Sequence, residues 1–264
     1  MSLRINSNIE AFNAHRQLVG TSDRVQKSME RLSSGYRINR AADDAAGLAI
    51  SEKLRGQIRG LAQAQRNSQD GVSLVQTAEG SLNEVHSMLQ RVRELAVQYQ
   101  NGTLSSADKA AITAEAAQLA SEIERIGTSS DFNGIKLLNG STTISFQVGA
   151  NDSDTISVTT ASLGQKVGSI DVTTSTSIAS IDAAITNVSS LRSTFGAVQN
   201  RLEHTLGNLA TYQENLMASE SRIRDVDMAS EMVEFSKNQI LQQAGTSMLA
   251  QANQAPQAVL LLLR

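Results

Sequence analysis

The side chains that most often carry catalysis or bind metals are few in this sequence and lie far apart. His15, His86 and His204 each stand alone, without the His-x-x-x-His or His-Glu-x-x-His spacing that places two ligands on one helix face. The absence of cysteine excludes thiolate nucleophiles, disulfides and Cys-ligated metals. Neither a Gly-x-Ser-x-Gly elbow nor a glycine-rich phosphate loop occurs. We therefore predict no enzyme, no metal site and no cofactor.

Two acidic clusters could act as acid–base pairs or metal ligands. Asp43 and Asp44 directly precede a long helical pattern, so we predict that they cap that helix, where free amides and the dipole favour carboxylates. The segment 151–154, Asn-Asp-Ser-Asp, lacks the glycine and the glutamate that a calcium-binding loop requires. It is interpreted as the tip of a hairpin.

The composition favours long helices over a wide globular interior. Aromatic residues make up 3% of the chain, and there is no Trp and only one proline. The net charge is −3, and cations before residue 60 alternate with carboxylates, so we predict no nucleic-acid partner. The longest apolar run, residues 258–263, is far shorter than the roughly 20 residues of a membrane span. The first residues lack the apolar core of a cleaved signal peptide, so we expect no membrane partner and, if the protein is secreted, another export route.

Helical periodicity covers most of the sequence. Apolar residues recur at intervals of three and four, which predicts helices over about residues 3–32, 44–99, 105–126, 177–216 and 226–264. The short turn at Asn101 and Gly102 implies that the third helix doubles back antiparallel on the second.

A β element interrupts the helices. Residues 143–148 and 155–159 alternate polar and apolar side chains around a short polar loop, which predicts a β-hairpin. The Ser- and Thr-rich stretch from Ala161 to Ser177 is interpreted as an exposed loop.

Both terminal helices carry apolar side chains at intervals of three, four and seven, which is typical of helices that pack on other helices. The two ends are therefore expected to meet each other or copies of themselves. The residues predicted to pack in a polymer core are Ile5, Ile9, Phe12, Leu18, Val25, Met29, Leu32, Met232, Phe235, Leu241, Met248, Leu249, Leu260 and Leu262.

Long sequence motifs stand out in both halves of the chain. The N-terminal half contains Met-Ser-Leu-Arg-Ile-Asn-Ser-Asn at residues 1–8, Glu-Arg-Leu-Ser-Ser-Gly-Tyr-Arg-Ile-Asn-Arg at 30–40 and Ala-Asp-Asp-Ala-Ala-Gly-Leu-Ala-Ile-Ser at 42–51. The C-terminal half contains Gln-Ile-Leu-Gln-Gln-Ala-Gly at 239–245 and Met-Leu-Ala-Gln-Ala-Asn at 248–253. These motifs resemble those of bacterial flagellin, the subunit of the flagellar filament. Only the hairpin and a loop separate the two halves, so the chain is similar to a short flagellin without outer variable domains.

The resemblance implies a fold class and a domain plan. The fold is mainly α, an elongated antiparallel helical bundle or coiled coil with a small β-hairpin element, in which the terminal helices form a second coiled-coil layer. Residues 1–43 and 219–264 are expected to build this inner core domain. Residues 44–218 are expected to form a rod domain with the hairpin near 131–175.

The resemblance also implies the function and the partners. The chain is expected to polymerise with copies of itself into the filament that drives swimming, outside the cell. It is expected to be exported unfolded through the flagellar type III apparatus with an export chaperone, and to meet filament cap and hook-junction proteins.

One segment resembles the part of many flagellins that Toll-like receptor 5 recognises. Leu-Gln-Arg-Val-Arg-Glu-Leu-Ala-Val-Gln occupies residues 89–98. Arg91, Leu95 and Glu115 match the receptor-binding positions, and an apolar anchor beside a guanidinium is a common hot-spot pair. A purely structural role for these residues in subunit packing stays open.

Two other functions remain as alternatives. A hook–filament junction protein resembles flagellin at both ends but does not polymerise at length, so self-assembly without other components separates the two. A secreted binding protein whose main role is receptor engagement is disfavoured because an outer domain is missing.

Overall fold

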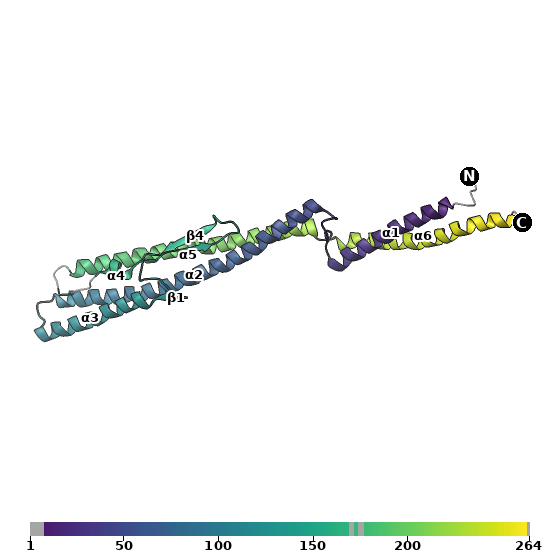
Figure 1. Cartoon of the computed structure of the whole chain (residues 1–264). Coiled ribbons are helices and arrows are strands. Elements are labelled where there is room, and N and C mark those ends of the chain that lie inside the picture. Colours follow the sequence, from purple (N-terminus) through teal and green to yellow (C-terminus); the bar gives the residue numbers. More distant parts are fainter. Residues whose placement is uncertain (1–7, 169–171, 174–176, 263–264) are drawn as a thin grey trace. The chain divides into compact units, whose positions relative to one another are not determined.

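The computed structural model of the chain describes residues 8–168, 172–173 and 177–262 (Figure 1). The chain divides into two compact units. We call residues 57–214 the central unit, and residues 1–56 with 215–264 the terminal unit. The domain boundaries expected from the resemblance, after residues 43 and 218, stay a prediction.

The long helices of the central unit run side by side (Figure 1). They belong to α2 (Ala45–Tyr99), α3 (Ser106–Ser129) and α5 (Ser177–Arg224). Polar contacts tie α2 to α5 in antiparallel order, since Arg93 pairs with Asp182 at 2.6 Å and the Gln65 amide donates to Gln213 at 2.9 Å. Helix α2 begins one residue after the predicted start at residue 44 and ends at the predicted residue 99, so its predicted bounds are confirmed to within one residue.

The central unit encloses an apolar core of its own. Gly71 of α2 allows a close approach, because a Cβ there would lie 3.1 Å from Leu202 of α5 and 3.3 Å from Phe146 of the hairpin. Side chains with at most 3% exposure fill the space between the three elements: Leu74, Val75, Ala78, Leu82, Val85, Leu89, Val188, Phe195 and Leu202. Burial of this kind stabilises the unit without help from another chain.

Two short antiparallel pairs make up the β structure. The predicted hairpin is confirmed as β3 (Thr143–Gln147) and β4 (Thr155–Thr159), in register from Thr143 opposite Thr159 to Gln147 opposite Thr155. A second pair, β1 (Asp131–Phe132) and β2 (Ile135–Lys136), was not expected. Asn133 and Gly134 connect its strands with φ angles of 50° and 80°, the left-handed backbone that this dipeptide tolerates.

The prediction of an exposed loop over residues 161–177 is wrong in part. A short helix, α4 (Leu163–Val167), begins there, and the side chain of Leu163 is 1% exposed against the core. Val172 is also buried, at 4% exposure. Serine and threonine dominate the composition of this stretch, but Leu163 and Val172 pack inward, which composition alone does not reveal.

The terminal unit is built on an antiparallel helix pair. Helices α1 (Ile9–Ser34) and α6 (Met228–Leu262) lie side by side (Figure 1). The Asn8 side-chain amide donates to the carbonyl of Ala252 at 2.7 Å near one end, and Arg31 pairs with Glu231 at 3.5 Å near the other. Segments from the two ends of the sequence thus form one structure.

Candidate assembly surface

The seam between α1 and α6 is poor in large apolar side chains. Leu18, Val25 and Leu32 of α1 are only half-buried, as are Phe235 and Leu249 of α6. The most deeply buried side chains of the terminal helices are polar, with Ser28 and Asn238 each 5% exposed. A seam of this composition stabilises a helix pair much less than the core of the central unit stabilises its own fold.

Large apolar side chains instead lie on the outer surface of both helices. Phe12 is 74% exposed, and Val233 and Ile240 are each 67% exposed. Other side chains between 45% and 64% exposed are Ile9, Val19, Met29, Met228, Met232, Leu241 and Met248. We call this set the exposed apolar surface of the terminal unit. So much uncovered apolar area is typical of a protein–protein interaction site.

The predicted packing residues divide into two groups. Leu18, Val25, Leu32, Phe235 and Leu249 take part in the half-buried faces of α1 and α6. The others whose side chains are described are exposed, namely Ile9, Phe12, Met29, Met232, Leu241 and Met248. Ile5 and the side chains of Leu260 and Leu262 lie outside the described residues. The heptad through Leu241 and Met248 is therefore not the contact of α6 with its own α1.

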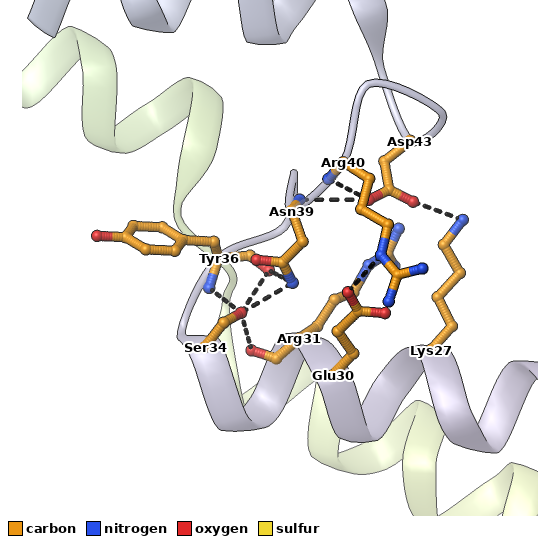
Figure 2. Close-up of polar contacts among 8 residues, drawn as sticks. All are labelled: Lys27, Glu30, Arg31, Ser34, Tyr36, Asn39, Arg40 and Asp43. Carbon is orange, nitrogen blue, oxygen red and sulfur yellow. Dashed lines mark hydrogen bonds and ion pairs between the residues drawn. The ribbon is translucent and has the colours of Figure 1, made fainter.

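Polar contacts hold the connector between α1 and α2, residues 35–44, against α1 (Figure 2). Gly35, with φ 74°, ends α1 in the left-handed conformation that glycine favours. The Asp43 carboxylate accepts bonds from the backbone amides of Asn39 at 3.2 Å and Arg40 at 3.0 Å, and it pairs with Lys27 of α1 at 2.7 Å. The loop is thus held by charge-assisted bonds, which are stronger than neutral ones.

Only one of the two neighbouring carboxylates caps α2. Asp44 accepts a bond from the Gly47 amide at 2.8 Å, so its predicted role is confirmed. For Asp43 the prediction is wrong, because its carboxylate binds the connector amides instead. Sequence spacing could not separate the two roles, since both residues directly precede the helix.

The environment of Asp43 favours its charged form. The bond from Lys27, followed by the bond from the Arg40 amide, lowers the pKa of Asp43 from 3.8 to about 2. The carboxylate is consequently ionised at neutral pH.

A second set of contacts joins the connector to the residues between α5 and α6. The backbone amide of Arg37 donates to the carbonyl of Arg224 at 2.7 Å, and the amide of Val226 donates to the carbonyl of Gly35 at 3.0 Å. The Arg224 guanidinium lies 5.0 Å from the centre of the Tyr36 ring. It also pairs with Glu52 at 2.5 Å, and this bond is the main cause that lowers the pKa of Glu52. These residues were not predicted, because nothing in their spacing marks them.

The three residues matched to a receptor site differ in exposure. Arg91 of α2 and Glu115 of α3 are exposed and form an ion pair at 2.9 Å, a bond that raises the pKa of Arg91. Leu95 is 1% exposed and belongs to a core cluster with Val92 and Ile112. Leu95 therefore packs between the helices, and the assignment of the three residues to a receptor site stays a prediction.

No catalytic or metal-binding arrangement accompanies these features in the part of the chain that the structure describes. Its His, Asp and Glu side chains form no group that could hold a metal ion. None of its helices is long and apolar enough to cross a membrane. The exposed apolar surface of the terminal unit is therefore the main candidate for function.

Two family models of known proteins match this chain, one in its N-terminal half and one in its C-terminal part. Residues 5–143 match the family model of the bacterial flagellin N-terminal helical region, and residues 178–263 match that of the C-terminal helical region. The chain belongs to the flagellin family. Flagellins are structural proteins and not enzymes, so the prediction that this chain is no enzyme is confirmed.

Relatives of similar length support the membership. The chain is 56% identical to a flagellin of Halalkalibacterium halodurans, with 98% of this chain and 99% of the relative covered. It is 50% identical to a flagellin of Bacillus subtilis, with 99% and 100% covered. It is 48% identical to the flagellar filament 33 kDa core protein of Treponema phagedenis, with 98% and 99% covered. The chain is thus a short flagellin without an outer variable domain.

Solved structures agree with the fold. The crystal structure of Bacillus cereus flagellin is similar with a TM-score of 0.51 and 31% identity, over 55% of this chain and 88% of that chain. A putative flagellar hook-associated protein from Vibrio parahaemolyticus is similar with a TM-score of 0.59 over 69% of this chain and 100% of that chain. Its identity is 16%, so this likeness shows the fold alone. The predicted class, a mainly α helical bundle with a small β element, is confirmed.

Proposed function

We propose that this chain is the structural subunit of a bacterial flagellar filament and that its terminal unit contributes most of the contacts between copies. The observation that carries the proposal is the exposed apolar surface, which the single chain leaves without a partner. A relative named as a flagellar filament core protein is 48% identical over almost the whole chain, which supports the same role here.

The distribution of apolar side chains around α6 supports burial on several sides. Val233 and Ile240 are seven residues apart and share one face, and Leu241 and Met248 are seven apart on another. Met228 and Met232 form a third exposed pair at a spacing of four. A helix that is apolar on most of its circumference is normally surrounded by other elements. Within one chain, the side of α6 that faces α1 carries the buried Asn238 and, among the large apolar side chains described there, only the half-buried Phe235 and Leu249.

A polymer explains this arrangement better than a closed pair. A two-fold dimer needs one self-complementary patch, whereas several different exposed faces allow heterologous contacts that continue from copy to copy. Such contacts produce helical filaments when the rotation does not close. We propose that the resulting filament drives swimming and lies outside the cell.

We further propose export in an unfolded state through the flagellar type III apparatus, aided by an export chaperone, with filament cap and hook-junction proteins as later partners. The thin seam between α1 and α6 supports this route, because a pair with little apolar burial is easily opened. The absence of cysteine removes the risk of disulfide formation on the way.

We propose that Toll-like receptor 5 contacts Arg91 and Glu115 directly, and that Leu95 acts only by supporting the helix. Arg91 and Glu115 present an exposed ion pair, whereas Leu95 supports the helix from inside. In a receptor reporter assay, Arg91→Ala should lower the response of intact protein at least tenfold. The control Arg125→Ala removes a similar exposed arginine, which pairs with Glu122 on α3, and should change the response less than twofold. Equal responses of the two variants would refute receptor contact through Arg91.

Electron microscopy of purified protein after precipitant-induced assembly tests the filament proposal. The full chain should form long tubes, and a version lacking residues 1–32 and 226–264 should remain soluble. The central unit keeps its apolar core in that version, so circular dichroism should still show a helical fold. Short caps or soluble protein from the full chain would favour the hook–filament junction alternative.

A further inference from the structure

Methionine is the side chain of this protein that a peroxide attacks most readily. The sequence contains seven methionines and neither cysteine nor tryptophan. A thioether has no proton to lose before it reacts, so its exposure to solvent largely decides how fast it is oxidised. The positions of the exposed methionines therefore indicate where an oxidant would act.

The two units differ in how far their thioethers are exposed. In the terminal unit, the methionines between 48% and 64% exposed are Met29, Met217, Met228, Met232 and Met248. In the central unit, Met88 is half-buried and packs against the apolar core. A dissolved oxidant would consequently act first on the terminal unit.

Most of these exposed methionines belong to the exposed apolar surface that we propose to bind other copies. We call them the surface methionines, namely Met29, Met228, Met232 and Met248. Met228 and Met232 are one turn apart on α6, and Glu231 between them pairs with Arg31 of α1. Met29 lies two residues before Arg31, so three thioethers lie at one level of the helix pair. The fourth lies further along α6.

We propose that the surface methionines are modification sites at which oxidation to the sulfoxide stops the free chain from joining a filament. The proposal rests on the function proposed above, because it requires this surface to be buried between copies. Assembly covers the same sulfur atoms in turn. Existing filaments should therefore resist an oxidant concentration that blocks their growth.

The oxidant is a hydroperoxide such as hydrogen peroxide. The thioether sulfur attacks one peroxide oxygen, so that an S–O bond forms and the O–O bond breaks. The departing hydroxide takes the proton of the transferred hydroxyl group, which leaves water and the sulfoxide. Sulfur is oxidised by two electrons, and the peroxide is reduced by two. A flexible apolar side chain thereby becomes a polar one.

The free chain tolerates a sulfoxide at these positions, whereas a contact between copies does not. In the free chain the side chains face solvent, so the new oxygen is hydrated and the fold is unchanged. In an apolar contact the same oxygen would lose its water without gaining a donor, which is unfavourable. Because each copy carries several surface methionines, even partial oxidation would affect most copies.

Hydrogen peroxide treatment of the purified full chain tests the inference. Mass spectrometry of peptides should find sulfoxide at the surface methionines, with Met88 oxidised at least about threefold more slowly because it is half-buried. The critical concentration for assembly, measured by light scattering and electron microscopy, should rise at least about tenfold. Circular dichroism should show an unchanged helix content.

The same treatment is applied to filaments that have already formed. They should persist, and their surface methionines should be oxidised at least about tenfold more slowly than those of the free chain, because neighbouring copies cover them. Reduction of the treated free chain by the two methionine sulfoxide reductases, one for each epimer, should restore assembly.

Two variants separate the surface methionines from the other oxidation sites. The first combines four replacements that keep an apolar side chain of similar volume: Met29→Leu, Met228→Leu, Met232→Leu and Met248→Leu. It should assemble equally well with and without peroxide, although it retains Met217, which is 48% exposed. The control, Met88→Leu with Met217→Leu, should stay as sensitive to peroxide as the native chain.

Three results would overturn the inference. They are normal assembly of a free chain that carries sulfoxide at the surface methionines, a loss of assembly in the peroxide-treated fourfold variant, or equal oxidation rates in filaments and free chain. If the fourfold variant does not assemble even untreated, the reductase step decides, and a failure to restore assembly of the native chain would overturn the inference. An untreated native chain that forms no filaments would instead refute the filament proposal.

Discussion

The central and terminal units use apolar residues in opposite ways. In the central unit, leucine, valine and phenylalanine side chains meet inside the chain, and many are at most 3% exposed. In the terminal unit, polar residues occupy much of the seam, while Phe12, Val233 and Ile240 are at least 67% exposed. The difference indicates that the central unit is stable by itself and that the terminal unit is completed by other copies of the chain.

The largest effect is expected from charges placed on the exposed apolar surface of the terminal unit, and this tests whether that surface is buried by other copies. Val233→Asp with Ile240→Asp should leave the unfolding of the free chain unchanged, because both positions face solvent. The same variant should form no filaments at about ten times the protein concentration at which the native chain assembles, since carboxylates would be buried unpaired. Light scattering and electron microscopy measure this.

Ser73→Asp is the control for that variant, because it adds a charge at an exposed polar position of α2. It should assemble like the native chain. Normal filaments from the Val233→Asp, Ile240→Asp variant would contradict the assignment of this surface to assembly.

Replacing one leucine by alanine in each unit compares how much buried apolar side chains stabilise the two units. Leu82→Ala in the core of the central unit should lower the free energy of unfolding by about 3 kcal/mol, because it leaves a cavity where the side chain is 0% exposed. Leu241→Ala in the terminal unit removes a side chain that is 45% exposed and should cost less than about 0.5 kcal/mol. Urea unfolding followed by circular dichroism measures both values. Similar costs would mean that the two units do not differ as described.

A smaller effect on the free energy of unfolding is expected from a change in the connector between α1 and α2. The bond from Lys27 and the bonds from the connector amides lower the pKa of Asp43 from its ordinary value of 3.8 to about 2, so these bonds stabilise the fold above about pH 4. That contribution is lost as the pH falls from about 4 toward 2. Asp43→Asn should therefore destabilise the protein by about 1 kcal/mol at pH 6, since Lys27 is half-exposed, and by less at pH 2.

Unfolding curves of the native chain and of Asp43→Asn at both pH values test this pH dependence. Asp23→Asn, at an exposed position of α1, serves as the control and should show no such change between the two pH values. A constant difference between native protein and Asp43→Asn from pH 6 to pH 2 would refute the role of the Lys27–Asp43 pair.

The sequence predicts the central unit well because its helices follow a simple rule there. Apolar residues at intervals of three and four point inward, so the bounds of α2 and the two strands of the hairpin could be inferred. The end of α5 could not, because it continues to Arg224, eight residues beyond the predicted residue 216. The short helix α4 and the burial of Leu163 could not, because five residues carry too little periodicity. The burial of Leu95 could not be inferred either, because a resemblance to a receptor site does not say which side of α2 a residue occupies.

The terminal unit shows why a heptad pattern alone is ambiguous. The spacing of Leu241 and Met248 predicts a packing face, but it does not say which helix packs there, and both side chains are exposed in the single chain. The actual neighbour of α6 within the chain, α1, meets Asn238 and Gly245, which an apolar pattern does not mark. In a polymer subunit, the strongest apolar pattern is free to serve contacts with other copies.

Amide hydrogen exchange of the free chain and of assembled filaments tests the difference between the two units most directly. In the free chain, the amides of α2 from Leu74 to Leu89 should be strongly protected and those of α1 and α6 weakly protected. Assembly should raise the protection of α1 and α6 at least about a hundredfold and change these α2 amides little. Equal protection of both units in the free chain, or no gain in α6 on assembly, would contradict the account.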